Sequence, residues 1–177
     1  LSIRRQRQMC IRDRTQGTFG KNEEVTWFFN REEGGLMILG NGEIPDYIYD
    51  LSSLDCPWRE NTDVKYVIIG PGITRVGAYS FYHMRGLVSA YMNEGVISIG
   101  KYAFAATKID RVLCPQSLER IGEKAFYNTM LYRVSLYCNV KNVYYDAFKE
   151  TPMTQLDMYG DAPEVEGDIY FYLPDDA

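Results

Sequence analysis

The chain has 177 residues, enough for one domain of ordinary size, and its formal net charge is −5. Residues 1–14 carry five arginines and one aspartate, so the rest of the chain has a net charge of −9. An acidic body is repelled by nucleic-acid backbones and anionic membranes, so we expect no nucleic-acid partner and no membrane insertion.

The first residues show no pattern of a folded element. Leu1–Arg14 has no apolar run long enough for a signal-peptide core or a membrane span. Its arginines would suit a nucleic-acid-binding arm, but the acidic body disfavours that interpretation. Met9–Arg14 resembles the translated remnant of a sequencing adapter, as found at the ends of genes from metagenomic assemblies. We therefore expect residues 1–16 to be a non-native or disordered extension, and the chain to be a fragment without its export signal.

Residues 17–63 precede the repeats and do not follow their period. Val25–Phe29 is rich in β-branched and aromatic residues, Arg31–Gly35 has the composition of a turn, and Leu36–Leu39 is apolar. This order predicts a β-hairpin. A terminal unit of a stacked array must cover an open core, so we expect residues 17–63 to form an N-terminal cap.

The sequence after this cap is repetitive. A six-residue motif that ends in Phe recurs with spacings of 23, 22 and 22 residues, at Phe81, Phe104, Phe126 and Phe148. Upstream of each Phe, apolar residues stand at positions 1, 4 and 6 of the repeat. This pattern is typical of leucine-rich repeats, in which each unit buries its apolar face only against its neighbours. We therefore expect a solenoid over residues 64–177 that ends in a C-terminal strand segment, with the four phenylalanines stacked in one buried column.

Each repeat is expected to contain a short strand at positions 3 to 7, such as Tyr66–Gly70 in the first repeat. Alternation along the strand sends positions 4 and 6 inward and positions 3, 5 and 7 outward. A second extended piece follows, such as Ile73–Val76, and a glycine then turns the chain at 77, 100 and 122. We expect a positive φ at these glycines and a single helical turn around each Phe. The predicted fold class is a β-rich, α/β-type repeat solenoid.

The segment Ile109–Phe126, which has the pattern I-x-x-V-x-x-P-x-S-L-x-x-I-G-x-x-A-F, resembles the BspA-type leucine-rich repeat. The motifs T-W, G-x-G-x-I-P-D-Y and P-W before the repeats are similar to the cap that often precedes such arrays. The resemblance implies a right-handed superhelix of short strands and single helical turns, capped by the hairpin. It also implies a secreted or surface-anchored protein with adhesin or matrix-binding activity.

No arrangement of residues in the sequence indicates catalysis. The single histidine, His83, follows Phe81 in a variable connection, and nothing near it suggests an orienting partner. Cys56, Cys114 and Cys138 are odd in number and have no C-x-x-C spacing, so they predict neither a disulfide framework nor a zinc site. We expect Cys114 to be a small buried apolar residue. We expect no enzymatic activity, no metal and no cofactor.

The outward strand positions are the candidates for partner binding, because Tyr and Arg are enriched at the centres of protein interfaces. High β-propensity would also favour Tyr in strands, and the sequence does not separate these two explanations. The candidate partner-binding residues are Tyr66, Tyr91, Arg111, Leu113, Arg133, Tyr137 and Tyr159. We expect these residues on one continuous sheet face, with Arg111 and Arg133 forming a local positive spot.

The expected function is a non-catalytic extracellular recognition module that binds a host or matrix protein, or a surface glycan, as an adhesin does. One alternative is a carbohydrate- or cell-wall-binding accessory module of an exported enzyme. Another is a purely structural spacer. The expected location outside the cell, or at its surface, comes from the family resemblance alone.

Overall fold

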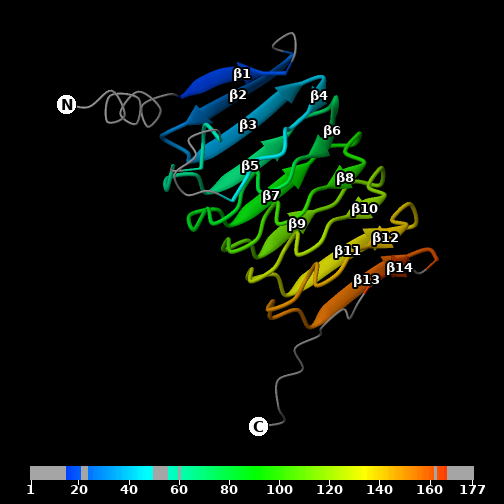
Figure 1. Ribbon diagram of the computed structural model, residues 1–177. Coiled ribbons are helices and arrows are strands. Elements are labelled where there is room, and N and C mark those ends of the chain that lie inside the picture. The colour runs from blue at the N-terminus through cyan, green and yellow to red at the C-terminus, as the bar shows by residue number, and fades with distance from the viewer. Residues whose placement is uncertain (1–14, 21–23, 50–55, 60, 162, 167–177) are drawn as a thin grey trace.

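The computed structural model describes residues 15–20, 24–49, 56–59, 61–161 and 163–166. In these residues the chain forms fourteen short strands and no helix, wound into a β-solenoid (Figure 1). Each repeat contributes one rung, with a strand on the first side, a strand on the second side and turns on the third. Most of the predicted N-terminal extension lies outside the described residues.

The strands form two stacks along the solenoid. The first side holds β1 (Gln16–Phe19), β2 (Val25–Asn30), β3 (Gly35–Gly40), β5 (Tyr66–Ile69), β7 (Ser89–Met92), β9 (Arg111–Leu113), β11 (Arg133–Tyr137) and β13 (Gln155–Tyr159). The second side holds β4 (Gly42–Glu43), β6 (Ile73–Val76), β8 (Ser98–Ile99), β10 (Arg120–Ile121), β12 (Asn142–Val143) and β14 (Glu164–Val165). The strands of the repeats lie where the period predicts them, and each pairs in parallel with the strand of at least one neighbouring rung.

An aromatic column runs through the core of the solenoid, as predicted. The ring centroids of Phe81 and Phe104 are 5.0 Å apart, those of Phe104 and Phe126 5.3 Å, and those of Phe126 and Phe148 5.4 Å. Adjacent rings are within 9° of parallel, and none of the four side chains is more than 2% exposed. The prediction of a single buried column is confirmed.

Trp58 continues this column toward the N-terminus, which the sequence analysis did not foresee. Its ring stacks on that of Phe81 at 5.8 Å, and its Nε1 donates a hydrogen bond to the carbonyl of Ser80 at 2.8 Å. Trp27 of the cap packs edge-on against the same indole at 5.9 Å. Trp58 precedes Phe81 by 23 residues and so occupies the Phe position of an earlier rung.

The third side is built from turns, and the predicted single helical turn is not formed there. Tyr79 has a φ of 56° and its equivalent Tyr102 a φ of 52°, which interrupt any helical run. The amide of Phe81 donates to the carbonyl of Ala103 on the next rung at 2.8 Å, whereas a helix would need a bond within the rung. Bonds between rungs therefore alternate with tight turns inside each rung, such as the bond from the Ala103 amide to the Gly100 carbonyl at 3.3 Å, and no helical turn forms. The right-handed sense of the superhelix stays a prediction.

The repeat glycines do not have the positive φ that we expected, because the left-handed residue comes two positions later in each rung. These glycines are required by the close approach of neighbouring backbones. A Cβ on Gly100 would lie 2.6 Å from the nitrogen of Ala78, and a Cβ on Gly122 would lie 2.7 Å from the carbonyl carbon of Gly100. Both distances are shorter than real Cβ contacts, so a side chain there would push the rungs apart.

The N-terminal cap contains the predicted hairpin, since β2 and β3 pair in antiparallel fashion with Trp27 opposite Ile38. β3 then pairs in parallel with β5, so one strand joins the antiparallel cap to the parallel repeats. The sequence analysis missed β1, which adds to the outer edge of β2. Gln16, which we assigned to the extension, belongs to this strand.

Replacing Phe104 by Ala should lower the free energy of unfolding by about 3–5 kcal/mol, because the ring loses stacking partners on both rungs and leaves a cavity. Chemical denaturation measures this loss. Met130→Ala, at a side chain that is 55% exposed, is the control and should change stability little. A loss at position 104 no larger than that of the control would contradict the column.

The thiols should differ in reactivity. Burial raises the pKa of Cys56 and of Cys114 to about 12, whereas Cys138 is exposed. We expect iodoacetamide at neutral pH to alkylate Cys138 in the folded protein, and Cys56 and Cys114 only after denaturation. Mass spectrometry of the digested protein reports each site separately. Equal modification of all three in the folded state would show that the core is open.

Candidate functional site

The outward face of the first sheet carries an apolar row that crosses five strands. Strand register places its members side by side, and they are Phe28, Met37, Ile68, Tyr91 and Leu113. Phe28 is 43% exposed, Tyr91 40% and Leu113 63%. A neighbouring row on the same face becomes polar toward the C-terminal rungs, where Ser89 lies beside Arg111.

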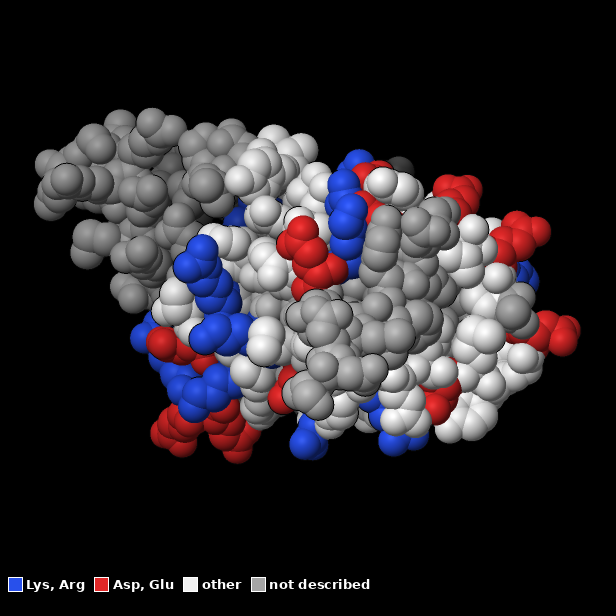
Figure 2. All heavy atoms as spheres, turned by 90° about the horizontal axis from the view of Figure 1, so that it is seen from below, with Lys and Arg blue, Asp and Glu red and all other residues white. Residues whose placement is uncertain are grey.

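Charged side chains of both signs lie at the C-terminal end of this solenoid. Figure 2 shows its C-terminal end, where Lys and Arg side chains lie intermingled with Asp and Glu. Several of these charges are paired between rungs, as in the contact of Lys101 Nζ with Glu123 Oε2 at 2.7 Å. Electrostatic recognition therefore depends on individual charges without such partners.

The first sheet is interrupted between β9 and β11. β9 pairs with β7 and β11 pairs with β13, but in the described chain no backbone hydrogen bond joins β9 to β11. The same two rungs stay bonded on their other sides. There the amide of Phe126 donates to the carbonyl of Ala147 at 2.8 Å, and that of Tyr144 to Ile121 at 2.9 Å. The expected continuous face is thus split on the first side alone.

Two arginines give a physical reason for the interruption. Arg111 and Arg133 hold the same position in consecutive repeats, so pairing of β9 with β11 would place like charges side by side, which is unfavourable. Arg133 turns instead toward β13, where its Nε donates to Asp157 Oδ2 at 2.7 Å. Over the described residues, Arg111 forms no ion pair. The expected basic pair is therefore one arginine paired with Asp157 and one arginine without an ion pair among the described residues.

The side chain of Gln155 stabilises the same carboxylate. Its Nε2 donates to Asp157 Oδ1 at 2.9 Å, and this bond, followed by the one from Arg133, holds the pKa of Asp157 below its usual value. Asp157 therefore stays ionised and keeps Arg133 on the β13 side of the interruption.

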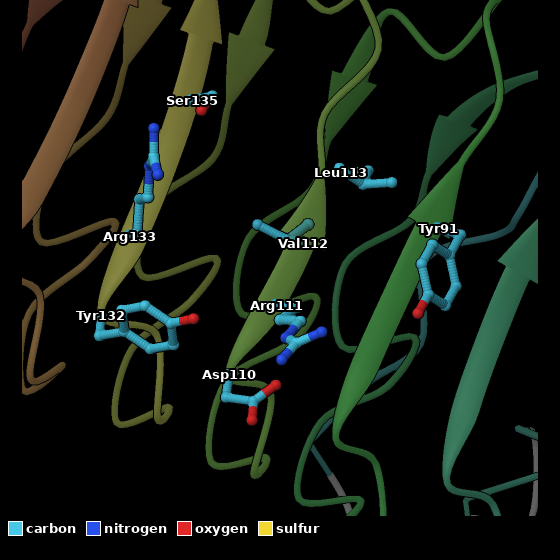
Figure 3. Close-up of a pocket in the computed structure, with 8 residues that line it drawn as sticks. All are labelled: Tyr91, Asp110, Arg111, Val112, Leu113, Tyr132, Arg133 and Ser135. Atoms are coloured by element: carbon cyan, nitrogen blue, oxygen red, sulfur yellow. The ribbon is translucent and has the colours of Figure 1, made fainter.

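The interruption leaves an open hollow of about 350 Å³, named here the β9–β11 hollow. It is lined by Tyr91, Asp110, Arg111, Val112, Leu113, Tyr132, Arg133 and Ser135. Val112 is 8% exposed, whereas Val67 at the same repeat position is 0% exposed, because no paired strand covers its edge. Figure 3 shows Tyr91 and Tyr132 on opposite sides of Arg111.

The predicted site residues fall into separate groups. Tyr91, Arg111, Leu113 and Arg133 line the hollow together. Tyr66 lies on β5, where its hydroxyl donates to Glu33 Oε2 at 3.1 Å.

The other two tyrosines lie at the far end of their strands. The rings of Tyr137 and Tyr159 stack on each other at 5.5 Å, where β11 and β13 end. Neither of them lines the hollow.

Sequence reasoning missed Tyr132 and Asp110, which line the hollow from position 2 of their repeats. That position precedes the strand and was not considered outward-facing. It also missed Phe28 and Met37, because they belong to the cap and have no place in the repeat period. Continuing the alternation of β2 and β3 into the repeat sheet would have found both.

The remaining chemistry-bearing residues do not gather at this face. His83 lies on the turn side, where Arg85 Nε donates to its Nε2 at 3.2 Å. Across the described ranges, no group of three or more His, Cys, Asp or Glu side chains could hold a metal ion. In the same ranges no helix is long and apolar enough to span a membrane.

Replacing Arg133 by Gln should raise the pKa of the Asp157 carboxyl toward its usual value, because one of its hydrogen-bond donors is lost. A carboxyl with a lowered pKa stabilises the fold above its unfolded pKa, and the contribution disappears as pH falls through the folded pKa. NMR titration of the carboxyl carbon measures the midpoint. Arg111→Gln is the control, and an equal shift in both variants would contradict the pairing.

Comparison with known proteins gives matches at the levels of family and fold. Residues 59–173 match the family described as BspA type leucine rich repeat region, in six copies. A leucine-rich repeat protein from Eubacterium ventriosum aligns over 81% of this chain at 21% identity, with a TM-score of 0.63. Another from Bacteroides ovatus aligns over 76% at 16% identity, with a TM-score of 0.52. No curated protein matches the chain.

The chain spans less than half the length of these two solved proteins, 44% of the first and 41% of the second. At these identities the structures show a shared fold only. The family match covers well over half of the chain and includes all four phenylalanines of the aromatic column. The protein belongs to the BspA-type leucine-rich repeat family.

Proposed function

We propose that this protein is a non-catalytic, adhesin-like recognition module that binds a partner protein at the cell surface or outside the cell. The binding surface is the outward face of β2, β3, β5, β7 and β9 together with the β9–β11 hollow. The observation that carries the proposal is the apolar row from Phe28 to Leu113, in which Phe28, Tyr91 and Leu113 are exposed and the two members between them are half-buried.

The apolar row is unusual for a surface that only meets water. Outward strand positions of a solvated sheet are ordinarily polar, whereas this row presents aromatic, methionine, isoleucine and leucine side chains on consecutive strands. Contiguous apolar area of this kind, bordered by polar residues, is typical of interaction sites. Aromatic residues, Met and Arg are also the types enriched at protein interfaces.

The site has groups for binding but lacks the usual pair for nucleophilic catalysis. The hollow offers two guanidinium groups, two phenol groups, a carboxylate and a serine hydroxyl, and the chain's single histidine lies on the turn side. Such groups fix the orientation of a partner. Membership of the family supports a location at the cell surface or outside the cell, which is part of the proposal.

A carbohydrate-binding accessory module is the second candidate, because Tyr91 and Tyr132 flank a polar hollow as aromatic side chains flank bound sugars. The length of the apolar row favours protein, since a sugar chain has no aliphatic side chains to cover it. A single face of this size is expected to bind modestly, with avidity added by further copies or repeats.

The double variant Tyr91→Glu and Leu113→Glu should weaken binding to its partner by about tenfold or more, since charge enters the centre of the apolar surface. Ile97→Glu with Tyr145→Glu is the matched control, as both side chains are similarly exposed but lie off this face. Binding of the wild type and both variants to immobilised matrix proteins and a glycan array measures the effect.

Matrix-protein binding that only the face variant loses would support the proposal. Selective binding to glycans would favour the accessory module. Equal binding by both variants would remove this face, and no binding by the wild type to any ligand would favour the spacer.

A further inference from the structure

The apolar row ends beside an arginine that has no ion-pair partner in the part of the chain described here. Leu113, the most exposed member of the row, and Arg111 are two residues apart on β9, so both side chains lie on the outward face. Arg133 is held by Asp157 and is not available in the same way. The face thus combines an apolar surface with one unpaired guanidinium, both at the edge of a hollow.

A guanidinium in this position favours a carboxylate. Arg binds carboxylates through two parallel hydrogen bonds, and flanking rings reduce the competition from water. Tyr91 and Tyr132 stand on either side of Arg111 in this arrangement (Figure 3). Asp110 lies in the same hollow without an ion pair to Arg111, and its charge weakens the attraction for an incoming acid.

The spacing on β9 also limits the shape of the ligand. Residues two apart on a strand are separated by about 6.6 Å, and an extended peptide has the same period on each of its faces. A peptide that lies over β9 with an apolar side chain on Leu113 and Tyr91 therefore places its next same-face side chain over Arg111. An acidic residue two positions from an apolar residue fits both contacts.

We infer that the β9–β11 hollow binds an extended acidic segment of a protein partner, in which an Asp or Glu carboxylate contacts Arg111 and an apolar neighbour covers Tyr91 and Leu113. This inference rests on the proposed function and names the ligand of the same face. The ligand segment has an apolar residue two positions before or after an Asp or Glu.

The test uses an array of short synthetic peptides that carry Leu, Phe or Val two positions from Asp or Glu, with matched Asn and Gln versions. Wild-type protein should bind the best acidic peptides about tenfold more tightly than their amide versions. In Arg111→Gln this ratio should fall to about one, because the carboxylate loses its partner. Arg120→Gln, an exposed arginine on the second side, is the control and should keep the ratio.

Asp110→Asn adds a gain-of-binding arm to the test. Removing its charge should tighten the acidic peptides about threefold and leave the amide peptides unchanged. A ratio that persists in Arg111→Gln, or a wild type that binds no acidic peptide in preference to its amide version, would overturn the inference. So would Arg111-dependent binding of uronic-acid oligosaccharides in place of peptides. The proposed function is tested separately by the Tyr91→Glu and Leu113→Glu double variant. If that variant binds matrix proteins more weakly than the wild type, the proposed function stands even where the acidic-peptide ligand is overturned.

Discussion

The structure depends on the stacking of one aromatic side chain per rung. Rings about 5 Å apart match the spacing of paired strands, so the column and both strand stacks can be satisfied by the same rise per repeat. Each ring is sandwiched between its neighbours and removes a large apolar area from water. Gly100 and Gly122 serve the same spacing, because a Cβ at either would collide with the preceding rung. Trp58 extends the column to the cap, where it meets Trp27, so the cap and the repeats share one core.

Neighbouring rungs are held together by the aromatic column and by backbone hydrogen bonds on the second side and the turn side. The strand pairing on the first side can therefore be absent locally while the rungs stay together. This happens between β9 and β11, where Arg111 and Arg133 would otherwise be adjacent. The bonds from Phe126 to Ala147 and from Tyr144 to Ile121 keep those rungs in register while the sheet opens. The opening provides a concave, partly polar site next to the apolar row. A stacked fold can in this way create a specific site on an otherwise regular surface without disturbing its core.

Much of this architecture could be predicted from the sequence, because the period of the Phe motif determines the rungs, the strands and the buried residues. The Phe period did not predict the place of Trp58 in the column, because its side chain is not Phe. It did not predict β1, because that strand belongs to no repeat. The turn side could not be predicted, since the left-handed residues Tyr79 and Tyr102 are not glycines and their conformation follows from hydrogen bonds between rungs. The hollow was missed for a related reason. The repeat pattern does not show that Arg133 pairs with Asp157 on the following rung, away from Arg111.

Amide hydrogen exchange measured residue by residue by NMR tests most directly the claim that stacked rungs are held in register while one side is open. Ser135 and Tyr91 occupy the same repeat position, but only Tyr91 lies on a strand paired with the preceding rung. We expect the Ser135 amide to exchange at least about tenfold faster than those of Tyr91 and Phe126, because open strand edges are protected little. Protection of Ser135 equal to that of Tyr91 would show a continuous sheet, and rapid exchange at Phe126 as well would show that the rungs themselves separate.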